Sequence, residues 1–288
     1  MIFFKKVMDG YNSQRAFPET KTILFLKSVG SKSASSPRTK RATETCRSAP
    51  ITSSILEDPL FIIRYNSTQQ FDSCLSDEVV KANLGLLLEQ PLPNDYLTIV
   101  KKKLDKSYPG GIPEDQLKLL GFLSRQYSTD KIGSWNLTSS DTLAALLNPE
   151  DGAWEMPQLR RLVARYMELG GSLTGPLLDI LGGKHLCFLD KDQLQEINPA
   201  SIRHAEKLDI STCAQVKKDI LYQKAHTAFA SQEGTSAYYP LIQPYLGGAS
   251  VEELKKLARY HVGMDIDTFI NLNREELKVS SDIVSYIA

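Results

Sequence analysis

The sequence predicts an all-α fold. Apolar residues recur at helical spacing through most of the chain, with little of the alternation typical of strands. Glycine pairs follow most of these apolar runs, at 110–111, 170–171, 182–183 and 247–248, where a glycine can adopt the left-handed conformation that ends a helix. A Leu-Gly pair also recurs, at 120–121, 181–182 and 246–247. Such degenerate repetition favours an α-solenoid of short helices over the alternative, an irregular globular α-domain.

The first well-defined helix is predicted to begin at Asn94, a capping residue, and to bury the apolar positions 97, 100 and 104. It should end at the Pro-Gly-Gly sequence 109–111. Pro113 then occupies a first-turn position ahead of leucines at 117, 120 and 123. Thr138 and Asp141 have the spacing of a capping box, and Ser250 and Glu253 repeat it.

Two longer helices are predicted between these caps. Pro157 opens the first, which the glycines at 170–171 should close. Thr212 opens the longest, with an apolar stripe made of Val216, Ile220, Leu221 and Phe229. A last amphipathic helix is expected at 279–287.

The N-terminal segment 1–41 differs from the rest of the chain. It holds nine of the 34 Lys and Arg residues but only two of the 34 Asp and Glu residues, and it is rich in serine. Its end reads Arg38-Thr39-Lys40-Arg41, the Arg-x-Lys-Arg pattern that furin-like proteases cut in exposed loops. We predict a removable pro-segment, 1–41, followed by a helical domain, 42–288. The mildly acidic remainder argues against nucleic-acid binding.

The cysteines favour an oxidising compartment. None of Cys46, Cys74, Cys187 and Cys213 lies in a Cys-x-x-Cys motif, so a zinc knuckle or a thioredoxin-like site is not indicated. Four cysteines allow three pairings, of which the local one closes two loops of similar size, 46–74 and 187–213. Four buried thiols in a cytosolic protein are the alternative.

Two N-x-S/T sequons agree with secretion. Asn66-Ser67-Thr68 and Asn136-Leu137-Thr138 both lack proline at the middle position. No apolar run is long enough to cross a membrane, and the first residues lack the apolar core of a signal peptide.

The residues do not indicate an enzyme, a metal site or a cofactor. The four histidines, at 185, 204, 226 and 261, are scattered, without HExxH spacing or a G-x-S-x-G partner. Asp190, Asp192 and Gln193 lack the full calcium-loop pattern and are better interpreted as a helix cap. Trp135 and Trp154 are predicted to lie in the core.

Four ordered segments resemble the mesothelin family, whose more distant members include stereocilin and otoancorin. They begin at Lys103 (KLDKSYPGGIPE), Trp135 (WNLTSSDTLAALL), Tyr245 (YLGGASVEELK) and Met264 (MDIDTF). The resemblance covers about residues 42–288, with the four cysteines in matching surroundings and the basic site just upstream of Cys46.

The resemblance implies a right-handed superhelical solenoid of short armadillo-like helical repeats. It also implies a glycosylated cell-surface protein that mediates adhesion by binding a large membrane mucin or another cell-surface glycoprotein, held by a lipid anchor absent from this sequence. The corresponding binding region is about Leu56–Leu104, where Phe61, Tyr65 and Phe71 are the expected contact residues. An intracellular helical-repeat scaffold is the alternative function, and a secreted hydrolase has no convergent nucleophile and base to support it.

Overall fold

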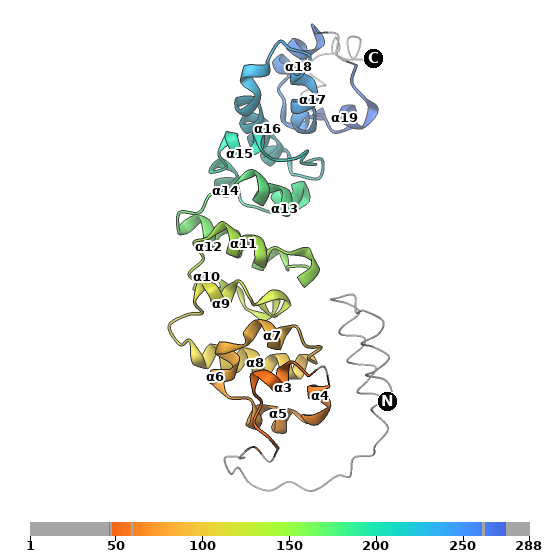
Figure 1. The fold of residues 1–288 in the computed structure, drawn as a ribbon. Coiled ribbons are helices and arrows are strands. Elements are labelled where there is room, and N and C mark those ends of the chain that lie inside the picture. The colour runs from red at the N-terminus through yellow and green to blue at the C-terminus, as the bar shows by residue number, and fades with distance from the viewer. Residues whose placement is uncertain (1–45, 47, 59, 261–262, 275–288) are drawn as a thin grey trace. The chain divides into compact units, whose positions relative to one another are not determined.

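A computed structural model of the 288-residue chain describes residues 46, 48–58, 60–260 and 263–274. All regular elements in these ranges are helices, which confirms the predicted all-α class (Figure 1). The cleavage residues Arg38, Lys40 and Arg41, His261 and the helix expected at 279–287 lie outside the described residues. The chain divides into two compact units, residues 1–158 and 159–288.

The N-terminal unit is built from short helices with apolar inner faces. Its longest helix within the unit, α8 (Asn94–Ser107), buries Leu97, Val100 and Leu104 as predicted, and it packs against α5 and α6. The 3-10 helix η1 and α9 both pack against α11. The other elements are α3 (Ser53–Leu56), α4 (Phe61–Arg64), α5 (Thr68–Cys74), α6 (Asp77–Ala82), α7 (Leu84–Leu88), α9 (Glu114–Leu117), η1 (Gly121–Gln126), α10 (Thr129–Gly133), α11 (Ser140–Leu146) and η2 (Pro149–Asp151).

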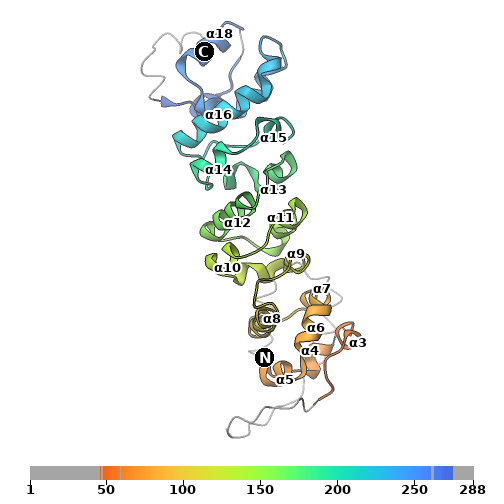
Figure 2. The same cartoon turned by 90° about the vertical axis from the view of Figure 1, so that its left-hand side faces the viewer.

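The C-terminal unit is organised around α16 (Gln215–Phe229), the longest described helix. It packs against α14, α15, α17 and η4, and Figure 2 shows α14 and α15 beside it. Helix α12 (Met156–Glu168) carries the chain across the division between the two units. The remaining elements are α13 (Gly175–Leu186), α14 (Lys191–Gln195), α15 (Pro199–Arg203), η3 (Ala230–Gln232), α17 (Tyr238–Ile242), η4 (Gln243–Gly248), α18 (Val251–Ala258) and α19 (Ile266–Ile270).

The helix starts confirm some predicted caps and correct others. Ser250 caps α18 by accepting a hydrogen bond from the Glu253 amide, as predicted. Asp190 and Gln193 form a capping box at the start of α14, which confirms their interpretation as a cap. The prediction of Thr138 as the cap of α11 is wrong, because Ser139 accepts the bond from the Asp141 amide.

The prediction for α16 is right in length and wrong in detail. Its N-cap is Ala214 rather than Thr212. Leu221 and Phe229 are buried as expected, but Val216, assigned to the apolar stripe, is 48% exposed. The helix therefore presents a different face to its neighbours than the apolar spacing alone suggested.

A polar contact recurs at a spacing of 35 residues. Gln158 Nε2 donates to the Arg125 carbonyl at 3.0 Å, and Gln193 Nε2 donates to the Arg160 carbonyl at 3.3 Å. Each glutamine Oε1 also accepts the amide of the residue three positions earlier. Each arginine Nε donates forward, to the carbonyls of Gly152 and Phe188 respectively.

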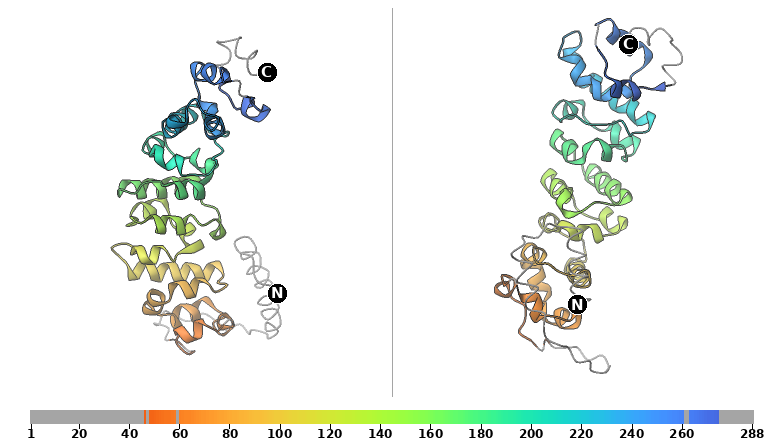
Figure 3. Two further views of the ribbon diagram at one scale, coloured as in Figure 1. Left: turned by 45° about the horizontal axis from the view of Figure 1, so that its top comes forward. Right: turned by 90° about the vertical axis from the view of Figure 1, so that its right-hand side faces the viewer.

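Each set of contacts therefore joins segments that are about 30 residues apart in the sequence, roughly the length of one helical hairpin. One set lies within each unit. The views in Figure 3 agree, since neighbouring colours lie side by side within each unit. The three Leu-Gly pairs do not share one structural role: Gly121 and Gly182 have positive φ angles of 47° and 69°, whereas Gly247 lies in η4 without one.

Candidate partner-binding surface

The segment expected to bind a partner, about Leu56–Leu104, comprises α3 to α8 of the N-terminal unit. A disulfide joins Cys46 to Cys74, the last residue of α5, and a second joins Cys187 to Cys213 in the other unit. The local pairing is thus confirmed. Each bridge closes a loop of 28 or 26 residues, which limits the freedom of the unfolded chain.

The three aromatic residues expected to contact a partner lie in the core instead. Phe61 and Phe71 are 0% exposed and Tyr65 is 1% exposed. The Phe71 and Tyr96 rings are 4.6 Å apart, and Tyr96 Oη donates to the Tyr65 carbonyl at 2.8 Å. Tyr65 Oη donates to the Ala49 carbonyl at 2.6 Å. We therefore correct the assignment: these side chains hold α4, α5 and α8 together and offer a partner no contact surface.

The two ends of α4 supply other candidates. Leu60, the N-cap residue of α4, is 39% exposed, and Arg64, the last residue of the helix, is exposed as well. Asn66 follows, also exposed. We call Leu60, Arg64 and Asn66 the α4 surface. Leu60 stands out in this segment, because most of the other large apolar side chains there are buried.

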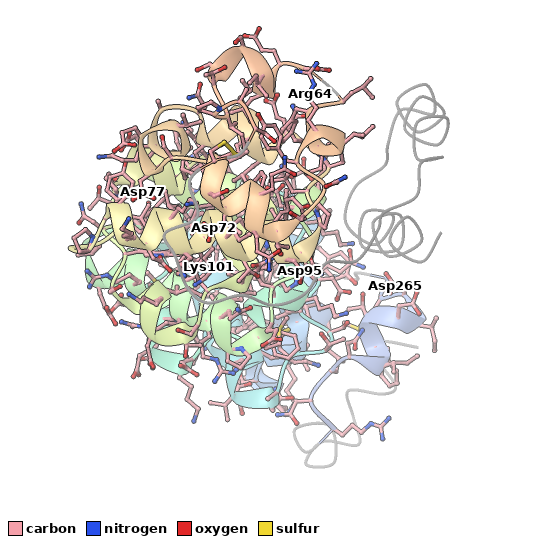
Figure 4. The ribbon with its side chains drawn as sticks, turned by 90° about the horizontal axis from the view of Figure 1, so that it is seen from below. Arg64, Asp72, Asp77, Asp95, Lys101 and Asp265 are labelled. Atoms are coloured by element: carbon pink, nitrogen blue, oxygen red, sulfur yellow. A yellow bond between two sulfur atoms is a disulfide. The ribbon has the colours of Figure 1, made fainter. Side chains whose placement is uncertain are left out.

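Salt bridges join helices of the same unit. Lys103 of α8 lies 2.8 Å from Asp72 of α5, and Lys106 lies 2.6 Å from Asp77 of α6. Arg64 itself pairs with Asp58 at 2.9 Å. Figure 4 shows Arg64, Asp72 and Asp77 on the face of this unit that is seen from below. Exposed pairs of this kind contribute little stability singly, but they leave a surface with both signs of charge.

Both sequon asparagines are accessible. Asn66 precedes Ser67, whose Oγ caps α5 by accepting the Gln70 amide at 3.2 Å. Asn136 is exposed between the buried side chains of Trp135 and Leu137. Glycosylation at either position stays a prediction, and its geometric requirement, an exposed asparagine, is met at both.

The sequon threonine Thr138 is held by Glu114 of α9. The carboxylate accepts bonds from the Thr138 amide and hydroxyl, at 2.8 and 2.6 Å, and from the Ser139 amide at 2.6 Å. Burial acts to raise the pKa of Glu114, but these bonds outweigh it, so the pKa lies below its ordinary value of 4.5. An ionised Glu114 therefore ties the loop before α11 to α9.

Trp135 and Trp154 are buried, as predicted. Trp154 Nε1 donates to the Leu146 carbonyl at 2.9 Å, and the Arg125 guanidinium lies 4.3 Å from its ring centroid. Burial lowers the pKa of Arg125 to about 10. Arg125 also donates to the carbonyls of Gly152 and Asn148, so it organises the turn before α12 rather than a reactive site.

The described histidines lie on separate elements. His185 Nδ1 is 2.6 Å from the Leu181 carbonyl, and His226 Nε2 is 3.7 Å from a Glu253 oxygen. Within the described ranges, no three His, Cys, Asp or Glu side chains come together as metal ligands would. None of the described helices combines the length and the apolar character needed to cross a bilayer.

Comparison with known proteins gives a consistent result. The family model described as Mesothelin matches residues 28–284. The chain is 44% identical to the mouse protein named Mesothelin-like protein over 254 residues, which are 88% of this chain and 36% of that protein. It is 42% identical to the human Mesothelin-like protein over 243 residues, 79% of this chain and 34% of the relative. Rat Mesothelin is 35% identical over 254 residues, 86% of this chain and 40% of the relative. The chain thus spans about a third of the length of these relatives.

Proposed function

The chain belongs to the mesothelin family, and on that basis we propose that it is part of an extracellular cell-surface glycoprotein that mediates adhesion by binding another surface protein. The observation that carries the proposal is the pair of disulfides, Cys46–Cys74 and Cys187–Cys213. Such bonds persist in oxidising compartments and are rare in the cytosol. The two exposed sequon asparagines agree with passage through the secretory pathway.

We propose further that the helices form a right-handed superhelix of armadillo-like repeats. Support comes from one set of contacts that appears twice, 35 residues apart, with Gln158 and Gln193 in equivalent positions. Repeat proteins bury the face of each unit against its neighbours and present long surfaces to partners. A binding role without enzymatic chemistry fits such a surface.

For the partner we propose a large membrane mucin or another cell-surface glycoprotein, contacted through the α4 surface. Arginine is one of the residue types that most often carry the binding energy of a protein interface, and the exposed Leu60 adds apolar area to the same surface. A glycan on Asn66 would stand at its edge, so we expect glycosylation there to weaken binding. We also propose that a furin-like protease cuts the precursor after Arg41 and that a lipid anchor holds the protein at the membrane. Arg41 lies outside the described residues.

The test is binding of the secreted chain to a mucin ectodomain by surface plasmon resonance, with and without enzymatic removal of N-glycans. Arg64→Glu should weaken binding at least about tenfold, because it places an acidic group beside Asp58 on the contact surface. Lys118→Glu is the matched control, since Lys118 is an exposed cation of the same unit outside the segment. Asn66→Gln should strengthen binding.

Two outcomes would overturn the proposal. If the folded, disulfide-bonded protein binds the mucin neither with its N-glycans nor without them, the mucin is excluded as partner. Alkylation of all four cysteines in the denatured, unreduced protein from its native source would instead exclude the secreted location and favour an intracellular helical scaffold.

A further inference from the structure

The C-terminal unit contains a cavity that the proposed adhesive function does not use. Its volume is about 330 Å³, far more than the space that a single water occupies. Its walls come from the loop after α15, the first turns of α16, η4 and α19. The residues that matter for its chemistry are Asp209, Lys218, Gly247, Asp265, Asp267 and Thr268.

Lys218 is the notable side chain of this cavity. It is only 8% exposed, although lysine is among the residues that are almost never fully buried without a partner. No hydrogen bond or ion pair joins its ammonium to any residue that the structure describes. Burial lowers the pKa of Lys218, and the negative charge of Asp209 acts in the opposite direction. Asp209 supplies an opposing charge but no direct bond, and a lysine side chain buried to this extent without a directly bonded anion is unfavourable. Its ammonium, which faces the cavity, therefore has room for an anionic partner.

Backbone packing fixes the position of this lysine. A Cβ on Gly248 would lie 2.1 Å from the Lys218 carbonyl oxygen, and a Cβ on Gly247 would lie 2.7 Å from the Asn271 carbonyl oxygen and 3.1 Å from Lys218 Cδ. Only glycines therefore allow η4 to approach α16 and the end of α19 this closely. Gly247 lines the cavity beside the Lys218 ammonium.

Two of the three carboxylates around the cavity already accept hydrogen bonds. Asp209 Oδ1 accepts the Ser211 amide at 2.9 Å, within its own turn. Asp265 Oδ1 caps α19 by accepting the Thr268 amide at 2.7 Å, and its other oxygen accepts a bond from Gln243. With Asp267, these groups line the cavity with hydrogen-bond acceptors around one buried cation.

We propose that this cavity binds a small molecule that carries a carboxylate flanked by hydrogen-bond donors. The carboxylate supplies a directly bonded counter-ion for Lys218, and hydroxyl or ammonium groups on the same molecule donate to Asp209 and Asp267. A phosphate dianion fits less well than a single carboxylate, because its second negative charge would add to a lining that already holds three carboxylates against the two ammonium groups of Lys207 and Lys218. Two sources share the required chemistry: a sugar acid and an amino acid.

The test is isothermal titration of the full 288-residue chain with D-glucuronate, the sugar-acid probe, and with L-serine, the amino-acid probe. D-Glucose and serinol are the matched compounds without a carboxylate. We expect saturable binding of at least one acid, with a Kd of about 1 mM or tighter, and none of the matched neutral or cationic compound. Which acid binds identifies the source.

Lys218→Met removes the charge and keeps an unbranched apolar chain of similar length. It should weaken binding at least about tenfold, while the helical circular dichroism is retained. Lys255→Met is the matched control, because Lys255 is an exposed lysine of the same unit and does not line the cavity. The amide resonances of Gly247 and Thr268 should shift during titration of the unchanged protein, which locates the ligand independently of any variant.

Three results would overturn the proposal: no saturable binding of either acid, equal binding of the carboxylate-free compound, or amide shifts that avoid the cavity. Because the α4 surface lies in the other unit, each result is separable from failure of mucin binding.

Discussion

The recurring glutamine contacts lead to a graded prediction of stability. In the C-terminal unit, Gln193 Oε1 accepts the Asp190 amide at 2.8 Å and Nε2 donates to the Arg160 carbonyl at 3.3 Å. Gln193 is buried, whereas Gln195 on the same helix is exposed. Since a buried hydrogen bond contributes about 0.5–1.5 kcal/mol net, Gln193→Ala should lower the free energy of unfolding by about 1–3 kcal/mol. Gln195→Ala should change it by less than about 0.5 kcal/mol.

Gln158 makes one more bond, because its Nε2 reaches the carbonyls of both Arg125 and Tyr127, at 3.0 and 2.8 Å. Gln158→Ala should therefore cost more, about 2–4 kcal/mol. Gln193→Glu separates the two functions of the side chain. It keeps an oxygen that can accept the Asp190 amide but places a carboxylate against the Arg160 carbonyl. This variant should be at least as destabilised as Gln193→Ala.

Urea unfolding followed by circular dichroism measures these differences, with the disulfides kept intact and the m-values compared. Hydrogen exchange then locates the loss, because faster exchange should be concentrated around α12 and α14. The reasoning is refuted if Gln195→Ala costs as much as Gln193→Ala. It also fails if Gln193→Glu is neutral, since the cap alone would then explain the effect.

Two further predictions concern the disulfides and an acidic cap. Replacing Cys187 and Cys213 together by serine should lower the free energy of unfolding by about 3–4 kcal/mol, because the bridge spans 26 residues. If the C-terminal unit of this variant unfolds at the same temperature as that of the native protein, the prediction is wrong. Glu114 has a lowered pKa, so its stabilising effect should be complete above about pH 5 and be lost as the pH falls through and below 4.5. The stability gap between the native protein and Glu114→Gln should close over that range, and a gap that persists at pH 2 would contradict the assignment.

Local signals in the sequence were enough to predict much of the fold. A cap such as Ser250 and the capping box at Asp190 act over three or four residues, and the structure confirms both. The apolar face of α8 is likewise fixed by spacing within one helix. These features depend on the chain close by, so they can be identified without knowledge of the neighbours.

The less successful predictions share one physical cause. Apolar spacing indicates which side of a helix is buried, but the choice of partner for a polar group depends on residues 27 to 33 positions away. The 35-residue contact pattern was therefore missed, and the Leu-Gly spacing suggested longer intervals instead. The family resemblance places a binding region at about Leu56–Leu104, and Phe61, Tyr65 and Phe71 were expected to contact the partner there. Aromatic residues occur in both interfaces and cores, and the structure shows that these three are buried in the core.

The glycine pairs show the same distinction at the level of the backbone. The sequence suggests that they end helices, and Gly182, with a φ of 69°, does interrupt α13. Its neighbour Gly183 has a different task, because a Cβ there would lie 1.9 Å from the Asp209 carbonyl oxygen. Gly248 likewise allows η4 to approach the backbone of α16 at Lys218. One residue of a pair can thus turn the chain while another permits two backbones to touch. Both contacts position residues of the C-terminal cavity, Asp209 in one case and Lys218 in the other, so the glycines that shape the fold also set the charges that a ligand would meet.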